Sequence, residues 1–170
     1  MTEKLERVVV DSCVVLDLLI DQDPERTASA AHLVDGHGKR HTIVVPAIVI
    51  AEIAGTGEVR GDHLGPAIRA ARIADVKAWI RASNFMVAEL SERVARRAAD
   101  LAVAHGLKGP DATVLATAEQ VGSPHLYTRD GKLLGCDGQL GFKITEPGPP
   151  PPPPPPDPQY DLFEEASHLN

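Results

Sequence analysis

Four acidic residues in this sequence have the residue type and the surroundings to act together in catalysis. Each stands next to an apolar run or on an apolar stripe, and they are Asp11, Glu52, Asp111 and Asp130. Carboxylate oxygens are the ligands that Mg²⁺ and Mn²⁺ prefer, and with few neighbouring His residues they are less suited to Zn²⁺. A carboxylate cluster that binds such a cation can activate water for attack on a phosphodiester and stabilise the leaving oxygen.

Two of these acids follow short apolar runs typical of buried strands. Asp11 follows Val8-Val9-Val10, and Asp130 follows Leu126-Tyr127-Thr128. Because ligands of parallel sheets bind outside the carboxyl ends of the strands, both acids are expected at the functional edge of the sheet. Simpler roles stay open: Asp11 or Ser12 could cap a helix, and Asp130 could belong to an ordinary turn.

The other two acids fall on expected helices. Glu52 lies four residues after Ile48, on the same helical stripe. A carboxylate on an apolar stripe costs several kcal/mol unless a cation or a hydrogen-bond donor meets it, so we expect a metal ion or an Arg beside Glu52. Asp111 follows Pro110 at a helix start, where it could be a cap or face the same crevice as the other acids. Carboxylates gathered in one crevice repel one another, and divalent cations relieve that repulsion.

The elements that must position these acids alternate between strands and helices. Strands are expected at residues 7–10, 42–45, 85–88, 125–128 and 142–145, and helices at 14–20, 24–35, 46–54, 64–82, 91–106 and 110–121. This alternation requires crossover connections and predicts an α/β fold, with a mainly parallel central sheet flanked by helices. Asp17 is expected at the exposed edge of the first helix.

The composition divides the chain of 170 residues into a domain and a tail. Ten of the 15 prolines lie between Pro147 and Pro158, and eight of them are consecutive. Such a segment favours a polyproline II rod, since proline can neither continue a helix nor pair in a central strand. We therefore expect a domain over residues 1–146 and a proline-rich, acidic and disordered tail over 147–170.

Charge and cysteine content narrow the class of protein. The net charge of −7 argues against a protein that coats nucleic acid with a basic surface, but four of the excess acids lie in the tail. With only Cys13 and Cys136, no secretory leader and no apolar run long enough for a membrane helix, we expect a cytoplasmic protein with reduced thiols and no membrane partner. Candidate contacts to RNA phosphates are Arg69, Arg72 and Arg129.

The four acidic motifs resemble those of PIN-domain ribonucleases, and most closely the VapC-type toxins of bacterial toxin–antitoxin systems. The matching segments are V-V-V-D-S-C, P-A-I-V-I-A-E, P-D-A-T-V-L and Y-T-R-D-G, which carry the four acids in the family's order. The resemblance spans about residues 7–145 and implies the PIN-like three-layer fold.

The resemblance also implies an activity, a cofactor and partners. It implies a Mg²⁺- or Mn²⁺-dependent endoribonuclease that forms a homodimer, leaves a 5′-phosphate and a 3′-hydroxyl on its RNA substrate, and is inhibited by a cognate antitoxin. By motif position the metal-binding catalytic residues would be Asp11, Glu52, Asp111 and Asp130, with Ser12 and Thr128 as supporting residues. The tail departs from the family pattern, because such toxins usually end soon after the last strand.

Two other classes of function stay open. A PIN module without catalysis could bind RNA or protein, although the presence of all four acids counts against it. A phosphotransfer protein could use Asp11 as its phosphorylated residue. A dehalogenase-type site needs a second Asp two positions later, where this chain has Cys13, and the paired acid and the late Lys of a receiver domain are not clear.

Overall fold

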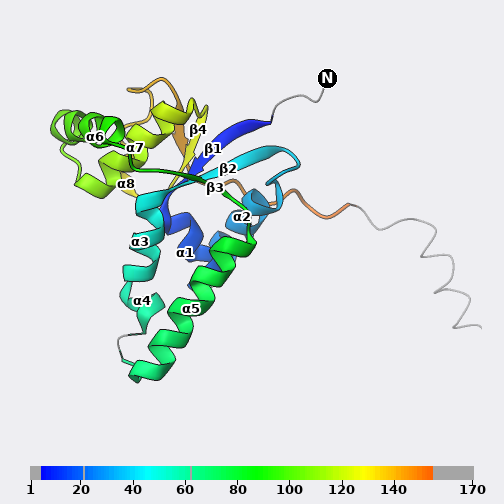
Figure 1. The fold of residues 1–170 in the computed structure, drawn as a ribbon. Coiled ribbons are helices and arrows are strands. Elements are labelled where there is room, and N and C mark those ends of the chain that lie inside the picture. Colours follow the sequence, from blue (N-terminus) through cyan, green and yellow to red (C-terminus); the bar gives the residue numbers. More distant parts are fainter. Residues whose placement is uncertain (1–4, 21, 62, 155–170) are drawn as a thin grey trace, which may run out of the picture.

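The fold is built on a parallel sheet of five strands in the order β3-β2-β1-β4-β5 (Figure 1). The computed structural model describes residues 5–20, 22–61 and 63–154. The strands are β1 (Glu6–Val10), β2 (His41–Pro46), β3 (Met86–Ala88), β4 (His125–Tyr127) and β5 (Lys143–Thr145). The α/β fold with a parallel central sheet flanked by helices is therefore confirmed.

The helices lie between the strands and begin or end where the sequence provides capping residues. They are α1 (Ser12–Ile20), α2 (Pro24–Asp35), α3 (Ala47–Gly55), α4 (Gly57–Arg60), α5 (Pro66–Ala82), α6 (Glu92–His105), α7 (Gly109–Val121) and α8 (Gly131–Leu134). The Ser91 side chain accepts a hydrogen bond from the backbone amide of Val94 and so caps α6. Gly106 ends α6 with a φ of 64°, in the left-handed region that glycine enters without steric cost.

The strand order places a change of direction next to β1. From β1 the chain proceeds outward to β2 and β3, and then returns to the other side of β1 to form β4. In open α/β sheets such a switch point opens a crevice at the carboxyl ends of the two strands. The pairing of β1 with β4 continues past the strand end, because the backbone amide of Asp11 donates to the carbonyl oxygen of Tyr127 at 3.0 Å.

Helix α7 lies at the centre of the packing. It contacts β1, β2 and β4, and α6 packs on it. All its residues from 112 to 118 are buried, which holds its first turn next to the sheet. Helix α1 contacts α2 and α3, while α4 and much of α5 extend away from the sheet (Figure 1).

The C-terminal segment begins on the domain surface. Pro147 is buried, whereas residues 148–154 are exposed and form neither helix nor strand. The disorder expected for the rest of the tail lies outside the described residues, and the domain boundary at residue 146 stays a prediction. Within the described parts of the chain, no helix is both long and apolar enough to span a bilayer.

Candidate metal-binding site

Asp11 is the most buried of the four acids and lies at the carboxyl end of β1. The residue is 6% exposed. Its Oδ1 accepts hydrogen bonds from the Ser12 backbone amide at 2.7 Å and from the Ser12 hydroxyl at 3.4 Å. Its Oδ2 accepts from the Thr128 hydroxyl at 2.8 Å and from the Cys13 thiol at 3.1 Å. These donors compensate the desolvation of a carboxylate at a buried strand end.

Thr128 joins the two strand ends of the site. It is fully buried, and while its hydroxyl donates to Asp11 its Oγ1 accepts a hydrogen bond from the Asp130 backbone amide at 3.0 Å. One side chain therefore fixes the position of both segments that carry these acids. Ser12 and Thr128 both contact Asp11, in agreement with the supporting position expected for them, although their role in activity stays a prediction.

Asp130 has a structural task of its own. Its Oδ1 accepts hydrogen bonds from the backbone amides of Lys132 and Leu133 and so caps the four-residue helix α8. Asp130 therefore begins a short helix and does not belong to the ordinary turn expected as its simpler role. The cap orients the carboxylate, and the charge of Asp130 still acts on Asp111.

Glu52 lies on α3 and is half-buried, as is Ile48 one turn earlier. Burial raises the pKa of the Glu52 carboxyl, the nearby charges of Asp11 and Asp111 raise it further, and a hydrogen bond from Ser12 opposes the shift. Of the two neighbours expected for Glu52, an Arg is not among these influences, whereas two acids are. This is the surrounding in which a carboxylate gains most from a bound cation.

Asp111 lies in the first turn of α7 and is half-buried. It does not cap the helix, because Lys108 occupies the cap position and makes no side-chain capping bond. Burial raises the pKa of Asp111, the charges of Asp130 and Asp11 raise it further, and those of Lys108 and Lys132 oppose the shift.

The charges of neighbouring acids therefore raise the pKa of Glu52 and Asp111 at the carboxyl edge of β1 and β4. Asp11 affects both Glu52 and Asp111, and Asp111 is affected by Asp130 as well. In the described part of the chain, no group of three or more His, Cys, Asp or Glu side chains is arranged so that it could hold a metal ion. The donors are all oxygens, which suits Mg²⁺ or Mn²⁺ in chemistry, while the side chains as they stand do not form a coordination sphere.

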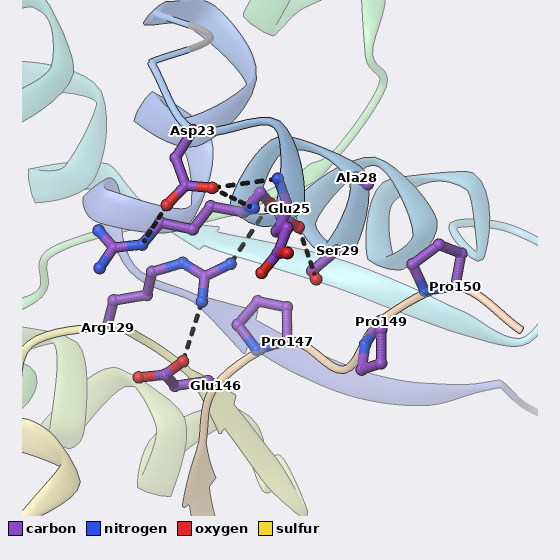
Figure 2. Close-up of a pocket in the computed structure, with 10 residues that line it drawn as sticks. Asp23, Glu25, Ala28, Ser29, Arg129, Glu146, Pro147, Pro149 and Pro150 are labelled. Carbon is purple, nitrogen blue, oxygen red and sulfur yellow. Dashed lines mark hydrogen bonds and ion pairs between the residues drawn. The ribbon is translucent and has the colours of Figure 1, made fainter.

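The three candidate RNA-contact residues lie in two different places. Arg69 and Arg72 belong to the N-terminal half of α5, the half that lies farther from the sheet in Figure 1. Arg129 precedes Asp130 in the sequence, but its side chain is only 10% exposed and forms an ion pair with Asp17. It also pairs with Glu146, as Figure 2 shows. Contact of any of the three with RNA stays a prediction.

Two residues near the acids have more contacts than their sequence context suggests. Asp17 is 14% exposed rather than at an exposed helix edge, because it pairs with Arg129 at 2.5 Å. The sequence around Asp17 does not indicate that Arg129, 112 residues away, is its partner. The Cys13 thiol donates a hydrogen bond to Asp11. Burial, followed by the charge of Asp11, raises the pKa of this thiol to about 12.

A model of the PIN domain family matches residues 8–136 of this chain, which therefore belongs to that family. This match includes the four acids, residues 8–10 of β1, the strands β2, β3 and β4, and the helices α1 to α8. No curated protein matches the chain.

Solved structures of toxin–antitoxin proteins have a similar fold. A toxin–antitoxin complex from Klebsiella pneumoniae has 20% identity and a TM-score of 0.59, with 84% of this chain and 99% of that chain covered. The sarcin–ricin loop cleaving toxin VapC20 from Mycobacterium tuberculosis has the same identity and TM-score, with 80% and 98% covered. VapBC2 from Rickettsia felis, bound to a promoter DNA fragment, has 12% identity and a TM-score of 0.57, with 81% and 98% covered. At these identities the likeness establishes the fold.

Proposed function

We propose that this chain is a divalent-cation-dependent endoribonuclease and the toxin of a toxin–antitoxin pair. The observation that carries the proposal is the gathering of four acids at the switch point of a PIN-domain sheet. Thr128 joins the segments of Asp11 and Asp130 there, and the charges of neighbouring acids raise the pKa of Glu52 and Asp111. The similar structures support it, because they include a toxin that cleaves the sarcin–ricin loop and complexes of toxins with antitoxins.

The cation would be held by Asp11, Glu52, Asp111 and Asp130. Burial together with nearby negative charge raises the pKa of both Glu52 and Asp111, so at neutral pH the free protein carries a repulsion that Mg²⁺ or Mn²⁺ would relieve. When bound, the cation would supply activation of the attacking water and stabilisation of the departing oxygen.

The protein's own residues would set the geometry of the reaction. Thr128 and Ser12 hold the Asp11 carboxylate by hydrogen bonds to its two different oxygens. The cap that Asp130 makes on α8 fixes the direction of that carboxylate. A phosphodiester brought to this edge would meet oriented carboxylates, and positioning of this kind contributes much of the rate gain in such reactions.

An antitoxin protein and a second copy of this chain are the proposed protein partners, with RNA as the substrate and the cytoplasm as the place of action. The four acids at this edge would repel a phosphate backbone without a cation, while Lys108 and Lys132 place positive charge beside Asp111. The proposed RNA contacts Arg69 and Arg72 lie on the half of α5 that is farther from the sheet, so they would bind phosphates at a distance from the four acids.

The test is expression of the wild type and of Asp111→Asn in a bacterial host without antitoxin, followed by mapping of 5′-phosphate RNA ends. We expect new ends at a small number of positions in wild-type cells and none in cells with the variant. New ends in both would contradict the proposal. RNA binding by the purified protein with no new ends in either case would favour the PIN module without catalysis.

A further inference from the structure

Arg129 joins three segments of the fold beside the acidic site. Its Nε donates to Asp17 Oδ2 on α1 at 2.5 Å, and its Nη2 donates to the carbonyl oxygen of Arg26 on α2 at 3.3 Å. Its Nη1 donates to Glu146 Oε2, just after β5, at 3.0 Å. Figure 2 shows the guanidinium group between the start of α2 and the segment that carries Glu146 and Pro147.

The same residue lies between two residues of the site in the sequence. Thr128 holds Asp11, and Asp130 is one of the four acids. The Arg129 backbone amide donates to the Cys13 sulfur at 3.1 Å, and that thiol in turn donates to Asp11. Any displacement of Arg129 would therefore move the donors of Asp11 and the backbone of Asp130 together.

The ion pair between Arg129 and Asp17 is protected from solvent. The Arg129 side chain is 10% exposed and that of Asp17 is 14% exposed, whereas Glu146 is 54% exposed. Screening by water and salt is weak for the pair with Asp17 and strong for the pair with Glu146. The contact with α1 is thus the stronger constraint on residues 128–130.

We propose that Arg129 is a positioning residue for the cation site. Through Asp17 it fixes residues 128–130 on α1, and it thereby sets the position of Asp130 and of the Thr128 hydroxyl relative to Asp11. This inference rests on the proposed function, since it concerns the affinity of the four carboxylates for a divalent cation. Arg129 would act on the cation site by positioning Thr128 and Asp130, and it would not contact the substrate.

The test measures Mn²⁺ affinity by calorimetry, in the full-length protein and without RNA. Because loss of one member of a buried ion pair can unfold a domain, the variants are conservative: Arg129→Lys and Asp17→Asn, each checked for native circular dichroism. We expect the Kd for Mn²⁺ to rise about tenfold in each, as for other residues that orient metal ligands. The double variant should bind Mn²⁺ no more weakly than the single variant with the higher Kd, because the two residues act as one unit.

A matched control separates positioning from a general loss of stability. Arg97 on α6 pairs with Glu119 on α7 through contacts of 2.6 and 2.9 Å, and neither residue is among the charges that shift the pKa of Glu52 or Asp111. Arg97→Lys should leave the Kd for Mn²⁺ within about twofold of the wild type, since it alters a guanidinium ion pair elsewhere, with side chains 45% and 28% exposed. Glu146→Gln should have a smaller effect than Asp17→Asn, because Glu146 is the more exposed partner.

The outcomes distinguish this inference from the proposed function. A wild-type protein that does not bind Mn²⁺ would overturn both. Wild-type binding with an equal Kd in Arg129→Lys, Asp17→Asn and Arg97→Lys would overturn the positioning role alone. An unchanged Kd for Mn²⁺ with a weaker, salt-dependent affinity of Arg129→Lys for RNA would also overturn it, and would assign Arg129 to RNA contact.

Discussion

The hydroxyl of Thr128 donates a 2.8 Å hydrogen bond to Oδ2 of Asp11, across 117 positions of the sequence. Both residues lie directly after strands, Thr128 after β4 and Asp11 after β1, and these strands are neighbours in the sheet. The hydrogen bond therefore connects the carboxyl ends of β1 and β4 at the switch point of the sheet.

Replacement of Thr128 by Val should destabilise the protein and weaken its activity. Val has nearly the same shape but leaves a buried carboxylate with one donor fewer, which costs about 1–3 kcal/mol in free energy of unfolding. Urea denaturation in EDTA measures this loss, and RNA cleavage measures the effect on activity.

Thr117→Val is the matched control for that experiment. Thr117 is also buried, but its hydroxyl donates only to the carbonyl oxygen of Thr113 within α7. Its replacement should cost less stability and leave cleavage unchanged. Equal losses of stability and activity in the two variants would show that the Asp11 contact has no special importance.

Asp111→Asn should make the cation-free protein more stable at neutral pH. Burial and the charges of Asp130 and Asp11 raise the pKa of Asp111 in the folded state. At a pH between the pKa of Asp111 in the unfolded chain and its higher pKa in the folded state, the folded protein therefore binds more protons than the unfolded chain. Stability of the wild type in EDTA should then increase as the pH falls through that raised pKa, and decrease as the pH rises. The variant lacks this dependence and should melt about 1–3 °C higher at pH 7, a shift that a few tenths of a kcal/mol can produce.

Glu119→Gln provides the opposite pH dependence as a control. The hydrogen bond from Arg97 lowers the pKa of Glu119 in the folded state. Ionised Glu119 therefore stabilises the folded protein at a pH above the pKa that this residue has in the unfolded chain. The stabilisation is lost as the pH falls through its pKa in the folded state. This variant should be slightly less stable than the wild type at pH 7 and equal to it at low pH. Thermal melting of all three proteins in EDTA from pH 3 to 8 checks both signs. A lower melting temperature for Asp111→Asn at pH 7 would contradict the predicted repulsion.

Both cysteines should react slowly in the folded protein. Burial, followed by the charge of Asp11, raises the pKa of the Cys13 thiol to about 12, and burial raises the pKa of Cys136. Because the thiolate is the reactive form, alkylation of Cys13 at pH 8 should be at least about 100-fold slower than that of a free thiol. Labelling with iodoacetamide, with and without denaturant, measures the rates, and Cys136→Ser isolates Cys13. Rapid labelling of Cys13 in the folded variant would contradict the environment described here.

Removal of residues 147–170 should leave the domain folded. The sheet is complete at Thr145, and Glu146, which pairs with Arg129, is retained. We expect unchanged cleavage and a small decrease in melting temperature, because Pro147 is buried. Removal from residue 142 onward also deletes β5 and should prevent folding. A shortened protein that ends at residue 146 and fails to fold would place the domain boundary within the tail.

The sequence predicts much of this fold because the local signals agree with the tertiary structure. The helix predicted from Pro24 to Asp35 has those bounds in the structure. The helix predicted over residues 91–106 is present as α6, which Ser91 caps and Gly106 ends. The two short helices α4 and α8 were not predicted, because four residues are too few to display a helical period.

The candidate site was predictable only in part. Position after a strand, or on an apolar stripe, predicts the four acids as a site, and in the structure the charges of Asp11, Asp111 and Asp130 raise the pKa of Glu52 or Asp111. The roles of Asp17 and Cys13 depend on contacts with Arg129, more than 110 positions away, and no local pattern encodes such contacts. The placement of Arg69 and Arg72 on a helix that extends from the sheet likewise depends on tertiary packing.

The most direct test of the central claim is cleavage of purified cellular RNA by the wild type and by Asp111→Asn, each with Mg²⁺, Mn²⁺ or EDTA. The account predicts cuts with 5′-phosphate ends for the wild type with either cation, none in EDTA, and a decrease of at least about 100-fold for the variant, in line with the loss of a group that stabilises the transition state. Equal cleavage by the two proteins, or cleavage by the wild type that persists in EDTA, would contradict it.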